Sequence, residues 1–153
     1  MRVVCSDRHR GHAPLAEIES SGLQPPFEHP GRADAIHDLL AGDDRFALVE
    51  PDEWGTAPIA AVHDPGLVDF LERAWADYQV RHPGTHDVVP DVFAMPGLLD
   101  GVGEFPARSL VDHELGRWCF ETTTPITEGT FDAARSAVDV ALTTTTAVPA
   151  PLS

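Results

Sequence analysis

The stretch Pro65-Gly-Leu-Val-Asp-Phe-Leu-Glu-Arg-Ala-Trp-Ala-Asp-Tyr78 carries the clearest structural pattern in the chain. Its apolar side chains recur every three or four residues, the spacing of one face of an α-helix. They are Leu67, Val68, Leu71, Ala74, Trp75 and Tyr78. Proline is favourable in a first helical turn, and Asp69 and Arg73 are spaced to pair on the solvent side. The pattern predicts a helix over residues 65–79, with Leu71 and Trp75 in the core.

Shorter elements lie on both sides of this helix in the sequence. The apolar runs at residues 2–6 and 46–49 predict buried strands, and the second is stopped by Pro51. Helices are predicted over residues 31–41 and 130–142, the second with Thr130 as its cap. Their apolar faces comprise Ala33, Ile36, Leu39 and Leu40, and then Phe131, Ala134, Val138, Ala141 and Leu142. A strand, a helix and a second strand begin a βαβ unit, so the expected class is α/β.

The remaining segments have no regular pattern. Residues 7–31 and 81–110 contain many Gly and Pro residues and predict loops. After Thr143-Thr-Thr-Thr146, two prolines break any helix, which predicts a disordered tail over 143–153 behind a domain of residues 1–142. A helix that ends in low-complexity sequence indicates a frameshift or premature stop. A cropped sequence and a genuinely short protein are the alternatives.

The charge balance is strongly acidic. The chain has 25 acidic and 10 basic residues, giving a net charge of −15 at pH 7. Such a charge repels nucleic acid and anionic membranes and attracts cations such as polyamines, although plain solubility explains it as well. Two cysteines are too few for a disulfide framework, and neither a signal peptide nor an apolar run of about 20 residues is present. These features favour a cytoplasmic protein without nucleic-acid or membrane partners.

Several stretches in order along the chain match one family. They are Met1-Arg-Val-Val-Cys-Ser6, Pro25-Pro-Phe-Glu28 with Arg32-Ala33, Val62-His-Asp-Pro-Gly66 with Phe70-Leu-Glu72 and Ala74-Trp75, and Thr124-Pro-Ile-Thr127 with Gly129-Thr130. In these stretches the chain resembles the N-terminal part of the acetylpolyamine amidohydrolases, bacterial members of the histone deacetylase family. The resemblance implies the N-terminal portion of an arginase/deacetylase-like three-layer α/β fold with a parallel sheet.

The resemblance also implies a catalytic zinc in full-length members. In the family an Asp-x-His pair and a later Asp bind the metal, and a His-His pair acts as acid and base. No His-His pair occurs in this chain. We therefore expect no catalytic residue, metal ligand or cofactor in this chain, and whether it acts as an enzyme is undecided. His9-x-x-His12, and His82 with His86-Asp87, remain weak alternatives for a metal site, and solvated loops are the simpler interpretation.

The segment 80–122 has an implied role of its own. In the family it helps to build a homodimer, and its acidic side chains receive the distal ammonium groups of the polyamine. That resemblance makes Asp112, Glu114 and Glu121 the candidate substrate-binding residues, because carboxylates are strong acceptors for ammonium groups. Ordinary surface charge is the alternative for all three.

These inferences give one main hypothesis for function. The chain is expected to be a truncated member of the zinc-dependent deacetylase family, whose full-length relatives hydrolyse acetylated polyamines or related acyl-amines. The chain alone is expected to be inactive. A non-catalytic dimerisation or polyamine-binding module is one alternative, and a non-functional pseudogene product is the other.

Overall fold

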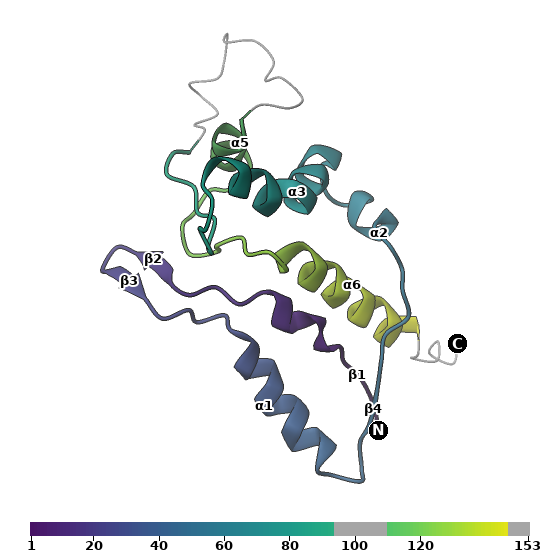
Figure 1. The fold of residues 1–153 in the computed structure, drawn as a ribbon. Coiled ribbons are helices and arrows are strands. Elements are labelled where there is room, and N and C mark those ends of the chain that lie inside the picture. Colours follow the sequence, from purple (N-terminus) through teal and green to yellow (C-terminus); the bar gives the residue numbers. More distant parts are fainter. Residues whose placement is uncertain (94–109, 147–153) are drawn as a thin grey trace. The chain divides into compact units, whose positions relative to one another are not determined.

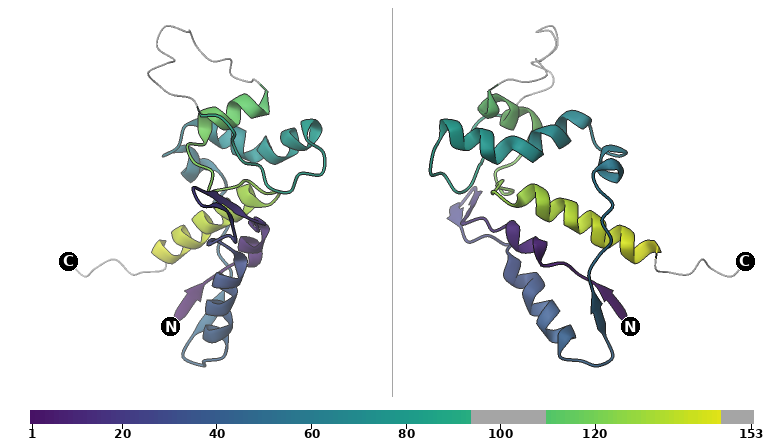
Figure 2. Two further views of the ribbon diagram at one scale, coloured as in Figure 1. Left: turned by 90° about the vertical axis from the view of Figure 1, so that its left-hand side faces the viewer. Right: turned by 45° about the vertical axis from the view of Figure 1, so that its right-hand side comes forward.

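The computed structural model describes residues 1–93 and 110–146. The chain forms two compact units, each assembled from segments that are separate in the sequence (Figures 1 and 2). The first unit contains residues 1–13, 28–62 and the segment that begins at Gly129, and the second contains residues 14–27 and 63–128. Within the described ranges, none of the helices combines the length and apolar character that a membrane crossing requires.

A parallel strand pair lies in the first unit. Strand β1 (Arg2–Val4) pairs with β4 (Ala47–Val49), and Val3 lies opposite Leu48. The helix α1 (Pro30–Ala41) connects the two strands, because a parallel pair needs a crossover. Both strands lie within the ranges that the apolar runs predicted. Together with α1, the parallel pair forms the βαβ unit expected from the sequence. The 3-10 helix η1 (Asp7–Gly11) follows β1, and the Ser6 side chain caps it by accepting from the Arg8 N–H.

Helix α1 forms where it was predicted, but its apolar face is not buried. Pro30 stands in its first turn and Gly42 at its C-terminal end, both favourable positions. None of its residues is buried, and Ile36 and Leu39 are 62% and 76% exposed. Helix α1 therefore forms although the described residues offer its apolar face little to pack against.

Helix α6 (Thr130–Thr146) is longer than predicted and buries a different face. The residues that it buries are Ala133, Ser136, Asp139 and Thr143, whereas Ala134 and Ala141 of the predicted face are exposed. Thr130 was predicted to be the cap but is the first helical residue, and Gly129 supplies the carbonyl that the Ala133 N–H binds. A Cβ atom at position 129 would lie 2.5 Å from the Gly11 carbonyl oxygen, so only glycine fits at this position.

The four threonines at residues 143–146 are helical, so the tail predicted from residue 143 is wrong over its first part. The hydroxyls of Thr144, Thr145 and Thr146 bind carbonyl oxygens one turn back in the helix. The Thr143 hydroxyl instead accepts from the Asp52 N–H at 2.9 Å and from Trp54 Nε1 at 3.1 Å. The two bonds of Thr143 fix the end of α6 to residues 52–54. Residues 147–153 of the predicted tail lie outside the described part of the chain.

The second unit has a buried apolar core. Helix α3 (Pro65–Arg81) packs on α5 (Val111–Trp118), and residues 88 and 126 add a short antiparallel bridge. The core comprises Phe70, Ala74, Val88, Val111, Leu115 and Ile126, with Leu67, Leu71, Trp75, Tyr78, Trp118 and Cys119 packed around it. The predicted helix over 65–79 is confirmed. The most buried side chain of the helix is Phe70, which is fully buried. Leu71 and Trp75, the predicted core residues, are only partly buried and pack against the core.

Short elements occur where loops were predicted. Strands β2 (Glu17–Glu19) and β3 (Gly22–Gln24) form a hairpin within the predicted loop 7–31, and Gly22 adopts a φ of 105° that favours glycine. Helix α2 (Ala57–Ala60) and helix α5 were also not predicted. Each hairpin strand has three residues and one apolar side chain, too short for an alternating pattern. Residues 94–109 of the predicted loop 81–110 lie outside the described residues.

Candidate functional site

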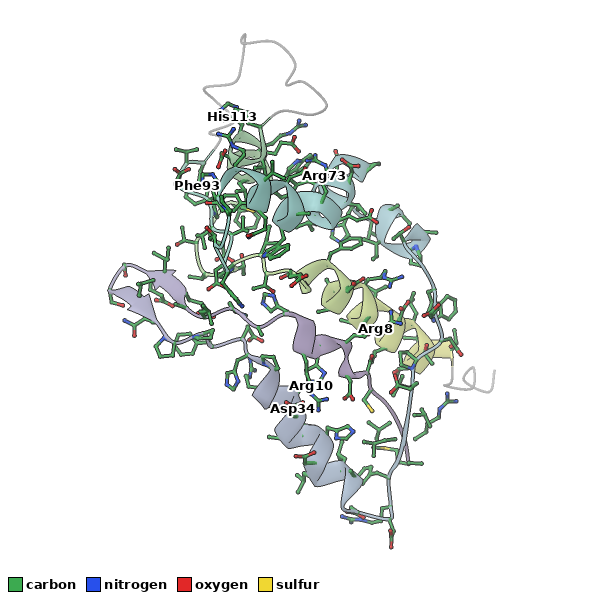
Figure 3. All side chains as sticks on the ribbon, viewed as in Figure 1. Arg8, Arg10, Asp34, Arg73, Phe93 and His113 are labelled. Carbon is green, nitrogen blue, oxygen red and sulfur yellow. The ribbon has the colours of Figure 1, made fainter. Side chains whose placement is uncertain are left out.

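Arg73 lies at the centre of an ion-pair cluster in the second unit, where Figure 3 labels it. Its guanidinium donates to Asp69 at 3.0 Å and to Asp77 at 2.8 Å, one helical turn away on either side. A third bond goes to Glu114 on α5. The Arg73 and Glu114 side chains are only 16% and 6% exposed. The sequence predicted the Asp69–Arg73 pair on the solvent side, and this is wrong for Arg73, because Glu114 holds the guanidinium between the two helices.

The charge state of Arg73 is fixed by these partners. Burial by itself lowers the pKa of Arg73. The hydrogen bonds to Asp77, Glu114 and Asp69 outweigh burial, so the pKa of Arg73 is raised overall. Three carboxylates contact this one guanidinium, and the bond to Glu114 joins α3 to α5.

Asp112 forms a second cluster, at the C-terminal end of α3. Its carboxylate accepts from Arg81 Nε at 2.6 Å and lies 2.8 Å from His82 Nε2. Burial raises the pKa of Asp112, but the hydrogen bonds from His82 and Arg81 outweigh it and leave the pKa below its usual value. The Tyr78 ring lies 4.3 Å from the His82 ring, and burial, followed by the charges of Asp112 and Asp91, raises the pKa of Tyr78. Tyr78 therefore stays protonated beside this cluster.

The three acidic residues predicted from the sequence have different surroundings. Asp112 and Glu114 lie in the first turn of α5, where negative charge also favours the helix dipole. Glu121 follows the helix, is exposed, and accepts a hydrogen bond from the Thr123 hydroxyl at 2.8 Å. The Glu121 carboxylate is thus open to an added cation, that of Asp112 contacts Arg81 and His82, and that of Glu114 is paired with Arg73.

The first unit contains a similar arrangement around Asp34 of α1. Asp34 accepts from Arg10 Nε at 2.9 Å, and Figure 3 labels both residues. Asp34 also lies 3.0 Å from His9 Nε2. The other ring nitrogen of His9 lies 2.7 Å from the Ser6 carbonyl oxygen. Burial raises the pKa of Asp34, but the hydrogen bonds from His9 and Arg10 outweigh it and lower the pKa overall.

The histidines considered as metal ligands are engaged separately. His12 Nδ1 lies 2.9 Å from the Thr130 hydroxyl, so His9 and His12 do not converge. His86 lies 2.6 Å from Asp87, whose other oxygen accepts from the backbone of residues 15 and 16. One Asp-x-His spacing, Asp7 with His9, was not among the predicted candidates, and Asp7 pairs with Arg10 instead. In residues 1–93 and 110–146, no three His, Cys, Asp or Glu side chains are grouped to hold a metal.

Comparison with known proteins identifies relatives of one kind. No family model matches the sequence. The chain is 37% identical over 145 residues to acetylpolyamine amidohydrolase 1 of Pseudomonas aeruginosa, and 32% identical over 142 residues to acetylpolyamine amidohydrolase 2 of that organism. These alignments cover 94% and 93% of this chain but 40% of each relative. The chain therefore spans about 40% of the length of the curated relatives that it matches.

The fold also has a solved counterpart. The crystal structure of acetylpolyamine aminohydrolase from Burkholderia pseudomallei matches 96% of this chain and 41% of its own chain, with a TM-score of 0.82 and 25% identity. The resemblance to acetylpolyamine amidohydrolases and the α/β fold predicted from the sequence are both confirmed.

Proposed function

We propose that this chain supplies the N-terminal part of a zinc-dependent amidohydrolase that acts on acetylated polyamines or related acyl-amines. The observation that carries the proposal is the 37% identity to acetylpolyamine amidohydrolase 1 along 94% of the chain. The fold match over 96% of the chain supports it. Action in the cytoplasm is part of the proposal.

Zinc is not assigned to the described residues. A catalytic zinc needs about three protein ligands, and no such group occurs among residues 1–93 and 110–146. Those residues do not fit a zinc centre, so no step of hydrolysis is assigned to them. The proposed contribution of this chain is a scaffold and an acidic surface, and the chain alone is proposed to be inactive.

The acidic surface is proposed to receive the distal ammonium of the polyamine. Glu121 is exposed and its carboxylate has room for a cation, and Asp112 lies at a partly exposed position between Arg81 and His82. Glu114 is proposed to act through Arg73, whose other partners, Asp69 and Asp77, are about half exposed. The net charge of −15 on the chain supports this role, because a negative field attracts cations.

A chimera tests the proposed function. This chain would replace the matching portion of Pseudomonas aeruginosa acetylpolyamine amidohydrolase 1, and hydrolysis of acetylputrescine would be measured. We expect activity that chelators abolish, and an inactive chimera that is folded and zinc-loaded would contradict the proposal. The chain alone, after dialysis, should hold no stoichiometric zinc and show no turnover. About one zinc per chain, or chelator-sensitive turnover, would show that the chain is an enzyme by itself.

The role of the acids is tested in the same chimera. Asp112→Asn with Glu121→Gln should raise KM for acetylputrescine, because its distal ammonium loses its acceptors. N-butylacetamide lacks that ammonium and is the control substrate, whose KM should not change. An equal change for both substrates would show that the two acids are structural.

A second candidate function is a non-catalytic module that pairs with a second copy and binds polyamine cations through residues 80–122. It is favoured by exposed apolar side chains in this segment, since Leu110 is 48% and Phe120 is 88% exposed. Sedimentation of the chain and of a Leu110→Ser/Phe120→Ser variant tests the pairing. Spermidine should bind weakly and with strong salt dependence, because exposed charges are screened within about 8 Å at physiological ionic strength.

A further inference from the structure

Asp112, one of the two carboxylates proposed to receive the polyamine, contacts two basic side chains of its own chain. Its Oδ2 accepts from Arg81 Nε at 2.6 Å, and its Oδ1 lies 2.8 Å from His82 Nε2. Asp112 and Arg81 together carry no net charge, so their attraction for a further cation is largely cancelled. Glu121 differs, because in the part of the chain that the structure describes its partner is the uncharged hydroxyl of Thr123. The two proposed acceptors are therefore not equally ready to take an ammonium group.

His82 is held in place by more than Asp112. Its ring centroid lies 4.3 Å from that of the Tyr78 ring, and its backbone N–H donates to the Tyr78 carbonyl at 2.8 Å. The His82 carbonyl in turn accepts from the Thr85 N–H at 3.3 Å. These contacts fix His82 at the C-terminal end of α3, so the residue has little freedom to leave Asp112.

Arg81 is held far less firmly. Its side chain is 44% exposed, and among residues 1–93 and 110–146 Asp112 is the carboxylate that it contacts. The contact is made by the Nε–H, whereas the strongest arginine–carboxylate pairs use two parallel N–H bonds. Exposed ion pairs contribute little to stability, so this one opens readily. Arg81 is therefore the member of this cluster that can leave Asp112.

We propose that Arg81 competes with the distal ammonium of the substrate for Asp112 and thereby sets how tightly the acidic segment binds a polyamine cation. This inference rests on the proposed function. With Arg81 bound, its guanidinium repels an incoming ammonium. With Arg81 turned into solvent, the Asp112 carboxylate accepts a charge-assisted hydrogen bond from the ammonium in its place. Each binding event at Asp112 exchanges one cation for another, whereas binding at Glu121 requires no exchange.

The exchange determines which acid contributes to affinity. In the unsubstituted chain, the gain from an ammonium at Asp112 is offset by the lost bond to Arg81, so Glu121 contributes most. Without Arg81, both carboxylates contribute, and Arg81→Gln should therefore tighten polyamine binding. A merely structural Arg81 would give the opposite result, because its loss would loosen the link between α3 and α5 beside Asp112.

Spermidine titrations of the full chain test this competition. The amide shift of residue 112 gives the dissociation constant at this position. We expect Arg81→Gln to lower that constant by about two- to fivefold, which is the range that the strengths of exposed ion pairs allow. The double variant Arg81→Gln/Asp112→Asn should lose this gain, because the carboxylate for which Arg81 competes is then absent.

Arg8→Gln is the matched control. Arg8, which Figure 3 labels, is 48% exposed and donates to the exposed Glu53 at 3.2 Å. The substitution changes the net charge as Arg81→Gln does but frees a carboxylate of the first unit, so the constant at residue 112 should not change. An equal gain with Arg8→Gln, no gain with Arg81→Gln, or a gain that survives in the double variant would overturn the proposal.

Two further measurements separate the competition from folding and from the proposed function. If Arg81→Gln unfolds the chain, the unsubstituted chain decides, since the Nε–H resonance of Arg81 must shift as spermidine binds, and a resonance that stays in place would overturn the proposal. In the chimera, Arg81→Gln should lower KM for acetylputrescine by a similar factor but not KM for N-butylacetamide. An equal change for both substrates would overturn the inference and leave the proposed function standing. An inactive chimera with the spermidine effects intact would contradict the proposed function alone.

Discussion

Helices α1 and α3 have apolar stripes of the same kind in the sequence but differ in what they bury. α3 fully buries Phe70 and Ala74 against α5 and residues 88 and 126, whereas α1 has no buried residue. A stripe gives a helix the capacity to pack, and the surrounding chain decides whether that capacity is used. In the second unit, the described residues complete a core. In the first unit they leave the face of α1 open over a cavity.

The largest expected effect is in the α3 core. Phe70→Ala should lower the free energy of unfolding by about 3–5 kcal/mol, because it empties a fully buried site. Ile36→Ala on α1 is the matched control and should cost less than about 1 kcal/mol, because Ile36 is 62% exposed. Urea titrations followed by circular dichroism measure both. Equal losses would show that α1 is packed as firmly as α3.

The next effect concerns the ion pair between α3 and α5. Glu114→Gln should destabilise the second unit by about 2–3 kcal/mol, because it removes a partner from a buried guanidinium that still keeps two carboxylates. Asp69→Asn is the control. Asp69 is 49% exposed, and losing its bond should cost about 1 kcal/mol or less. Amide exchange of α5 reports the difference, and comparable exchange in both variants would mean that Glu114 is no stronger a link than a surface pair.

In the first unit, α6 is expected to hold residues 52–54 through polar bonds. Thr143→Val should cost about 1–2 kcal/mol, because the Asp52 N–H and the Trp54 indole lose their acceptor at a buried position. Thr144→Val removes an exposed hydroxyl and should cost well under about 1 kcal/mol. Tryptophan fluorescence during denaturation follows the change. If both variants unfold at the same denaturant concentration, the bonds of Thr143 do not stabilise the unit.

The smallest effect compares the two Asp–Arg–His clusters at acid pH. The folded-state pKa values of Asp112 and Asp34 are lowered. Their contributions are therefore complete above the unfolded pKa of about 3.9 and are lost as pH falls through the folded pKa. We expect Tm to be lower in Asp112→Asn and Asp34→Asn than in the unsubstituted chain at pH 6, with the difference closing at lower pH. A difference that is unchanged at pH 2 would contradict a charge-based role.

The sequence predicted the elements that are long or strongly patterned. The strands at 2–6 and 46–49 and the helices at 31–41, 65–79 and 130–142 all occur, because their apolar spacing spans whole strands or several helical turns. The β2–β3 hairpin was missed because each of its three-residue strands has only one apolar side chain, whereas β1 and β4 are as short but mostly apolar. Helix α5 was missed because its eight residues span only about two turns. The buried face of α6 was also missed, because Ser136, Asp139 and Thr143 are buried through hydrogen bonds and not through apolar character.

For the candidate site, the sequence identified residue types and not their partners. It placed Asp112, Glu114 and Glu121 in the acidic segment 80–122, and the structure then shows that two of them bind arginines of α3. The sequence predicted a pair of Arg73 with Asp69 but not with Asp77, which lies at the same four-residue spacing on the other side. The link of Arg73 to Glu114 joins residues 41 positions apart, and no local pattern reveals such a contact.

The sequence by itself determined the α/β class, the likeness to acetylpolyamine amidohydrolases and the acidic character of the chain, because these depend on local periodicity, ordered motifs and composition. Only the tertiary structure decided which apolar faces are buried and which carboxylates are paired. Burial and ion pairing depend on distances between segments far apart in the sequence. Two stripes as similar as those of α1 and α3 therefore differ only once their neighbours are in place.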